Sequence, residues 1–144
     1  SEKKPTLREA KASATVFASP ELICLVKEKA LPKGDVLSVA KVAGIQAAKK
    51  THELIPMCHP LRISHVDIDI SLKENTIEIG SLVKAFDQTG VEMEALVAVA
   101  VAALTIYDMC KSFERGIVIS DVMLLKKSGG RSGVWRRKKK VLSG

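Results

Sequence analysis

The sequence predicts one α+β domain in which an antiparallel sheet packs against helices. Residues 66–72 and 77–85 alternate apolar and polar side chains, as strands with one buried face do. Turn residues 73–75 separate them, so the two segments are expected to form an antiparallel hairpin. A long apolar segment, residues 89–111, follows the hairpin and predicts a helix. Helical and extended patterns elsewhere complete the mixture that is typical of this class.

The first elements are a strand and a short helix. Residues 1–10 are expected to be extended and loosely held, and alternation over 12–18 predicts the strand. Ser19 and Pro20 are typical of a helix start and predict a helix over 21–30.

A second helix is predicted over residues 36–50, where apolar residues recur at helical spacing. Pro32 and Gly34 end the helix that precedes it, and Asp35 can act as its N-cap. Gly44 within this helix indicates close packing against a neighbour.

The remaining elements fix the topology. Pro56 and Pro60 bracket a segment, residues 51–61, that cannot be regular helix and is too apolar for a casual surface loop. After the hairpin and the long helix, residues 117–125 predict a last strand. The order β-α-α-β-β-α-β has the ferredoxin-like fold as its nearest common template.

Length and charge indicate a single domain with a basic tail. The 144 residues and 15.6 kDa suit one domain, which we place at residues 1–135. The net charge is +7, and residues 136–140 supply five of these charges, so the domain itself is mildly basic. We therefore expect residues 136–144 to be a solvated, disordered tail, a commoner outcome than an interaction arm.

The sequence indicates a cytoplasmic protein. Cys24, Cys58 and Cys110 are odd in number and lack a framework spacing, which fits reduced thiols better than disulfides. A signal peptide and a transmembrane segment are not recognisable, and we expect no membrane partner.

The long helix is apolar in its middle and charged at both ends. Only Ala, Val, Leu, Ile, Thr and Tyr occur between Ala95 and Tyr107, which predicts a helix that is buried on every side and packs against another subunit. The apolar segment is expected to be too short to span a bilayer. Glu94 and Asp108 are 14 residues apart, about 21 Å along a helix. One small-molecule site cannot easily use both ends directly.

Asp108 and Lys111 share one face of this helix. An exposed ion pair is the commonest form of this spacing, but the apolar turns before it favour burial. A buried pair could act as acid and base near neutrality. The simplest role of Glu92 and Glu94 is to favour the helix dipole. If both ends of the helix are functional, either a long ligand spans them or the two glutamates complete a site with another chain, which suits an apolar helix at an interface better.

Two further segments concentrate groups that could bind a ligand. Residues 49–60 contain His, Cys and Lys without a metal-ligand spacing, so we expect no metal site and favour a His59 that hydrogen-bonds a ligand. Residues 126–133 combine basic and hydroxyl groups with glycines and suit an anion, although they match no P-loop and a flexible basic linker is an equal alternative. With Lys3, Arg8 and Lys33 they offer cations to a polyanionic small ligand.

Three blocks and two upstream segments carry a resemblance to a known family. The sequence closely resembles the molybdenum cofactor biosynthesis protein C family, the cyclic pyranopterin monophosphate synthases, from about residue 3 to residue 133. The blocks are KKTHELIPMCHPL, TGVEMEALVAVAVAALTIYDMCK and LLKKSGGRSG, with KPTLREA and PKGDVLSVAKVAGIQAAK upstream.

The resemblance implies an activity and an assembly. The family converts 3′,8-cyclo-7,8-dihydroguanosine triphosphate, a GTP-derived cyclic triphosphate, to cyclic pyranopterin monophosphate and releases pyrophosphate. It has a ferredoxin-like α+β fold and forms a homo-hexamer, a trimer of dimers, with the active site at a dimer interface. No cofactor is implied.

The matching motifs also imply site residues. The catalytic positions are Asp108, Lys111 and Lys33. The substrate-binding positions are Met57, Cys58, His59, Met93 and Glu94, and the residues expected near the ligand or its phosphates are Glu92, Lys3, Arg8, Lys127 and Arg131.

A nucleic-acid-binding module is the rival interpretation, because a sheet with a cationic tail can bind RNA. Such sheets stack bases on aromatic side chains, and this chain has one Tyr, one Trp and three scattered Phe. We therefore expect no nucleic-acid partner. A purely structural oligomer would leave Asp108, Lys111 and the His59 segment without a purpose.

Overall fold

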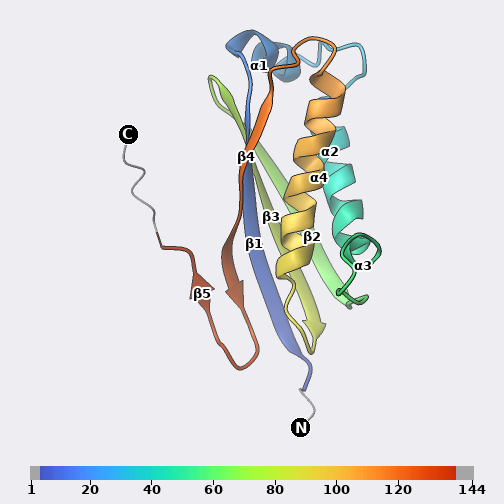
Figure 1. The fold of residues 1–144 in the computed structure, drawn as a ribbon, viewed down its shortest axis with the longest axis vertical. Coiled ribbons are helices and arrows are strands. Elements are labelled where there is room, and N and C mark those ends of the chain that lie inside the picture. The colour runs from blue at the N-terminus through green and yellow to red at the C-terminus, as the bar shows by residue number, and fades with distance from the viewer. Residues whose placement is uncertain (1–3, 139–144) are drawn as a thin grey trace.

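Two long helices lie side by side against a five-stranded antiparallel sheet (Figure 1). This computed structural model describes residues 4–138. The strand order β2-β3-β1-β4-β5 confirms the predicted α+β, ferredoxin-like arrangement, with β5 added at one edge. The elements are β1 (Thr6–Phe17), α1 (Pro20–Lys27), α2 (Val36–Lys49), α3 (Thr51–Leu54), β2 (Ile63–Leu72), β3 (Thr76–Asp87), α4 (Glu92–Cys110), β4 (Val118–Ser128) and β5 (Trp135–Arg136).

Strand β1 is the centre of the sheet and begins earlier than predicted. It pairs with β3 from Thr6 to Phe17 and with β4 from Glu9 onward, so residues 6–10 are held in the sheet rather than loosely. Hydrogen bonding to a long neighbouring strand is a tertiary effect that alternation over 12–18 does not reveal. The helix-facing side chains of β1 are buried and mostly small: Ala10, Ala12, Ala14 and Val16.

The two long helices make a close backbone contact at Gly44. A Cβ at this position would lie 2.9 Å from the carbonyl oxygen of Ala98 in α4 and 3.2 Å from Ile68 Cδ1 in β2. Glycine is therefore required for the observed separation of α2 from α4, as the sequence predicts.

Helix α4 is not buried on every side by its own chain, and the expected cover by another subunit stays a prediction. Leu104 is 57% exposed, and Val101 and Thr105 are partly exposed. The expected shortfall in length is wrong, because by length and composition the 19 residues could cross a membrane. Inside the fold, 56% of this apolar stretch is buried, so α4 is the core helix.

Two local differences from the sequence predictions have simple causes. Helix α1 ends at Lys27, before residue 30, and Lys29 then takes a left-handed φ of 56°. The segment predicted to lack regular helix begins with one turn, α3. The hydroxyl of Thr51 donates to the carbonyl oxygens of Ala47 and Ala48, so α3 continues directly from α2.

Strand β4 extends to Ser128, so Lys126 and Lys127 lie in the sheet and the alternative of a flexible linker is wrong for them. They pair with Arg136 and Trp135 of β5, a strand that the sequence did not predict. The expected disordered tail over residues 136–144 is therefore wrong for Arg136, and for Arg137, whose backbone N–H donates to the carbonyl oxygen of Leu125 at 2.8 Å. Residues 139–144 lie outside the described residues.

Replacing Gly44 with Val is expected to lower the free energy of unfolding by about 1–3 kcal/mol, because the added side chain must push α2 away from α4. Gln46→Val adds the same branched side chain at an exposed position of α2 and should cost less than about 1 kcal/mol. Denaturant-induced unfolding of the two variants measures the difference. Equal stabilities would contradict the close contact.

Candidate active site

The predicted site residues form two groups at opposite ends of α4. The helix begins beside α3 and the hairpin of β4 and β5, and it ends beside α1 and the loop between α1 and α2 (Figure 1). We call the first group the α4 cleft, which consists of two adjoining cavities described below. We call the second group the Asp108 cluster, which consists of Lys33, Asp108 and Lys111.

The larger cavity of the α4 cleft, about 660 Å³, is basic. Its walls include Lys4, Arg8, Lys127 and Arg131, with Glu92 as the acidic residue. Lys127 Nζ lies 3.6 Å from Glu92 Oε2, so one cation already has a carboxylate neighbour. The remaining positive charge makes this cavity suitable for an anion.

A glycine turn encloses the guanidinium group of Arg8. Gly129 and Gly130 have φ values of 103° and 73°, and a Cβ on Gly130 would clash with this group. On the opposite side, Arg8 Nη2 donates to the carbonyl oxygen of Gln88 at 2.7 Å and Nε to that of Asp87 at 3.3 Å. Arg8 therefore fixes the chain before α4 while it lines the basic cavity.

The smaller cavity, about 190 Å³, contains the other predicted binding residues. Gly90 and Glu92 line both cavities, so the two adjoin. The segment before β2 and the first turn of α4 supply further lining residues, which are Met57, Cys58, His59, Leu61, Met93 and Glu94.

Glu94 is the buried acid of this cavity, with 4% of its surface exposed. Burial raises the pKa of its carboxyl group, and the charges of Glu92 and Asp87 raise it further, against a hydrogen bond from its own backbone N–H. Burial, with a smaller contribution from Glu94, also raises the pKa of the Cys58 thiol. The two side chains provide polar groups in a partly dry cavity, as binding of a polar ring requires.

In the Asp108 cluster, two ammonium groups contact Asp108, one at its carboxylate and one at its backbone carbonyl oxygen. Lys111 Nζ lies 2.9 Å from Asp108 Oδ1, and Lys33 Nζ donates to the backbone carbonyl oxygen of Asp108 at 3.2 Å. The hydrogen bond and charge of Lys111 lower the pKa of Asp108, and Lys33 adds a smaller effect. Asp108 raises the pKa of Lys111 in return.

The expected burial of this pair is wrong for the single chain. The side chains of Asp108 and Lys111 are 62% and 51% exposed, because the last turn of α4 buries Met109 and Cys110 but leaves Asp108 at the surface. The pKa of Lys111 is therefore raised by its carboxylate partner, whereas a lysine among cations would have a lowered pKa.

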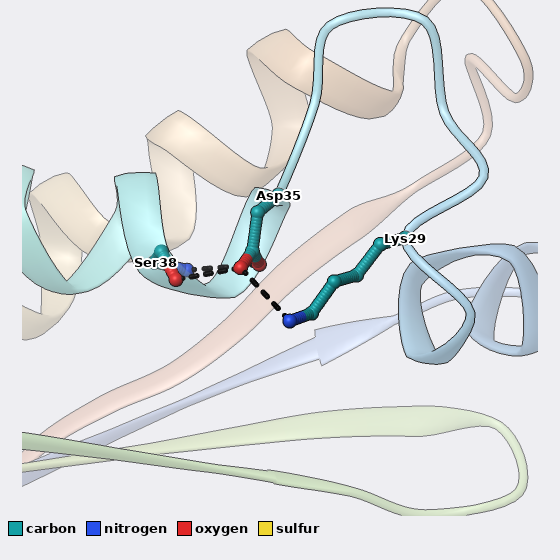
Figure 2. A network of polar contacts seen from close by, with 3 residues as sticks. All are labelled: Lys29, Asp35 and Ser38. Carbon is teal, nitrogen blue, oxygen red and sulfur yellow. Dashed lines mark hydrogen bonds and ion pairs between the residues drawn. The ribbon is translucent and has the colours of Figure 1, made fainter.

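The turn that carries Lys33 is held by the N-cap of α2, as Figure 2 shows. The Asp35 carboxylate accepts hydrogen bonds from the Ser38 backbone N–H at 3.3 Å and from the Ser38 hydroxyl at 2.7 Å. Lys29 Nζ lies 3.5 Å from Asp35 Oδ2. The hydrogen bonds from Ser38 lower the pKa of Asp35, with a smaller contribution from Lys29.

Comparison with known proteins identifies the family. A model of the MoaC family matches residues 1–130. The chain belongs to the MoaC family. The cyclic pyranopterin monophosphate synthase of Peptoclostridium acidaminophilum is 54% identical over 135 residues, which cover 94% of this chain and 86% of the relative. The enzyme of the same name from Geobacter metallireducens is 55% identical over 137 residues, with the same coverages.

A more distant relative, the cyclic pyranopterin monophosphate synthase of Streptomyces avermitilis, is 50% identical over 135 residues and covers 94% of this chain and 79% of its own length. These relatives confirm the resemblance found in the sequence. This MoaC-family chain is an enzyme, a lyase, of molybdenum cofactor biosynthesis.

The structure of this MoaC-family chain also contains site residues that the sequence did not single out. Lys4 joins the basic cavity, and Gln88, Thr89 and Gly90 form its floor before α4. A single Lys beside another Lys near the start of a chain gives no signal of its own. Lys3, by contrast, lies outside the described residues. Among residues 4–138, no group of three or more His, Cys, Asp or Glu side chains could hold a metal ion.

The pKa of Asp108 is expected to lie below its ordinary value of 3.8 and to rise toward it in Lys111→Ala, which removes the hydrogen bond and the nearest charge. Lys33→Ala should raise this pKa less. Because the folded-state pKa is lowered, the pair's contribution to stability is present above the unfolded-state pKa and is lost as the pH falls through the folded-state pKa. An NMR titration of the side-chain carboxyl carbon measures both variants, and an unchanged pKa in Lys111→Ala would contradict the pairing.

Proposed function

We propose that this chain converts 3′,8-cyclo-7,8-dihydroguanosine triphosphate to cyclic pyranopterin monophosphate and releases pyrophosphate by acid–base catalysis. One observation carries the proposal: a basic cavity adjoins a cavity that contains a buried carboxyl group, and Gly90 and Glu92 line both. A triphosphate attached to a polar bicyclic ring needs these two environments side by side.

The basic cavity binds the phosphates. Arg8, Lys127 and Arg131, with Lys4 beside them and Lys3 next in the chain, neutralise the charge that grows on pyrophosphate as it leaves. Glu92 pairs with Lys127 and releases it when the phosphates bind.

The smaller cavity binds the ring. Met57 and Met93 supply apolar contact, and Cys58, His59 and Glu94 supply polar contact. The raised pKa of Glu94 keeps a proton available for hydrogen bonding to higher pH than an exposed glutamate would allow.

The Asp108 cluster supplies the proton transfers from a neighbouring chain. Asp108 accepts protons as the anion, and Lys111 and Lys33 donate them. Since about 21 Å of helix separates Glu94 from Asp108, one chain cannot bring both to one reacting ring. A dimer in which the cluster of one chain faces the α4 cleft of its partner removes this difficulty.

Apolar side chains around the Asp108 cluster support such an interface. Leu104 lies one helical turn before Asp108, and Phe113 lies two residues after Lys111; they are 57% and 50% exposed. Exposed apolar groups beside a functional cluster are typical of protein–protein contacts. The proposed assembly is a homo-hexamer, a trimer of dimers, that works in the cytoplasm without a cofactor and without nucleic acid.

Lys111→Ala should abolish product formation while the assembly stays folded, because the removed ammonium group is exposed and supports no part of the core. Product is measured by chromatography after incubation with the cyclised triphosphate, and folding by circular dichroism and size-exclusion chromatography. Lys73→Ala, which removes an exposed lysine from the β2–β3 turn, is the control and should retain full activity. Turnover by Lys111→Ala would refute the assigned role.

Mixing two inactive variants tests whether the site is shared between chains. After joint unfolding and refolding at equal amounts, His59→Ala and Asp108→Ala should regain about a quarter of the wild-type activity, because half of the dimers are mixed and each has one intact site of two. A mixture of Asp108→Ala with Lys111→Ala should stay inactive, because both changes damage the same cluster. Recovery in the second mixture, or none in the first, would contradict the shared site.

A further inference from the structure

The carboxylate of Asp87 connects two segments that are distant in the sequence. Asp87 is the last residue of β3 and is half-buried. Its Oδ2 accepts a hydrogen bond from the backbone N–H of Arg62 at 3.0 Å, and its Oδ1 accepts one from the backbone N–H of Gln88 at 2.8 Å. Both oxygens of one side chain are therefore used by the backbone.

These two N–H groups lie next in the chain to residues that line the smaller cavity, Leu61 on one segment and Thr89 on the other. Arg62 directly follows the segment that carries Cys58 and His59, and the backbone N–H of Phe86 also donates to the Arg62 carbonyl oxygen at 3.3 Å. Gln88 begins the connection into α4, whose next residues, Thr89 and Gly90, line both cavities.

Arg8 holds the same connection from the other side. Its guanidinium group donates to the carbonyl oxygens of Asp87 and Gln88 at 3.3 and 2.7 Å. The backbone of Asp87 is thus anchored to β1, and its side chain is free to bind the His59 segment. An anchored carboxylate that accepts two backbone N–H groups makes stronger bonds than a neutral acceptor.

We propose that Asp87 is a positioning residue, which holds the segment carrying His59 against the entrance to α4 and so sets the separation of the two cavity walls. The proposal rests on the proposed function, because it assigns ring binding to this cavity. Asp87 acts through the backbone of Arg62 and does not contact the reacting atoms.

The electrostatics agree with this geometry. The hydrogen bonds from Arg62 and Gln88 lower the pKa of Asp87, and the charges of Arg62 and His59 contribute less, against a raising effect of burial. Asp87 is therefore an anion at neutral pH, and both of its oxygens can accept.

Asp87→Asn tests the proposal, because the amide keeps one acceptor and turns an NH₂ group toward one of the two N–H donors. Backbone hydrogen exchange over residues 57–62 should accelerate about tenfold, and KM for the cyclised triphosphate should rise about tenfold while kcat changes less than about twofold. Asp67→Asn, an exposed aspartate on β2, is the matched control and should change none of these quantities.

A purely structural role would give a different result: a lower Tm with faster exchange across the whole sheet, or a fall in kcat at constant KM. Either result, or unchanged exchange over residues 57–62, would overturn the proposal. Asp87→Ser keeps one acceptor without the repulsive NH₂ group and should give a smaller rise in exchange and KM, so it serves if Asp87→Asn does not fold. If the wild-type enzyme fails to turn over the cyclised triphosphate, the proposed function fails, and the exchange measurement still decides whether Asp87 positions the segment.

Discussion

The length of one rigid helix is the constraint on which the rest of the molecule depends. Helix α4 carries the proposed binding residues on its first turn and Asp108 on its last, and a helix of this length keeps them about 21 Å apart. Side-chain movement cannot close such a distance. The α4 cleft of one chain and the Asp108 cluster of another must therefore meet if both take part in one reaction, and subunit contact becomes a condition of the proposed chemistry.

The rigidity of α4 comes from close packing of small residues. Gly44 lets the backbone of α2 approach Ala98, and the alanines of β1 let the opposite side of α4 approach the sheet. Interiors packed in this way transmit displacements instead of absorbing them. A change at Gly44 would consequently shift both ends of α4, although this glycine contacts neither the cleft nor the cluster.

Local patterns predicted the elements, and tertiary contacts decided the rest. The alternation of apolar and polar side chains was sufficient to predict β2 and β3, because each strand has one face against the helices. It missed the first residues of β1 and the whole of β5, which are fixed by pairing with neighbouring strands. The described motif residues that were predicted to bind the ligand lie together in one cleft, and their role stays a prediction. The motifs gave no sign of Asp87, whose partners are a backbone N–H 25 residues away and its own neighbour.

Exposure of Asp108 and Lys111 is the feature that sequence reasoning misjudged, and it has a consequence for catalysis. In the single chain the two groups stabilise each other's charged form while water solvates both, which keeps Asp108 a weak base and Lys111 a weak acid. Covering the pair with the partner's cleft in the proposed dimer would remove water from both groups. Desolvation raises the pKa of a carboxyl group and lowers that of an ammonium group, so it would bring both toward neutrality, where proton transfer is most effective. The burial that the apolar helix predicted would then be supplied by assembly, and the same contact that completes the site would also tune its acid and its base.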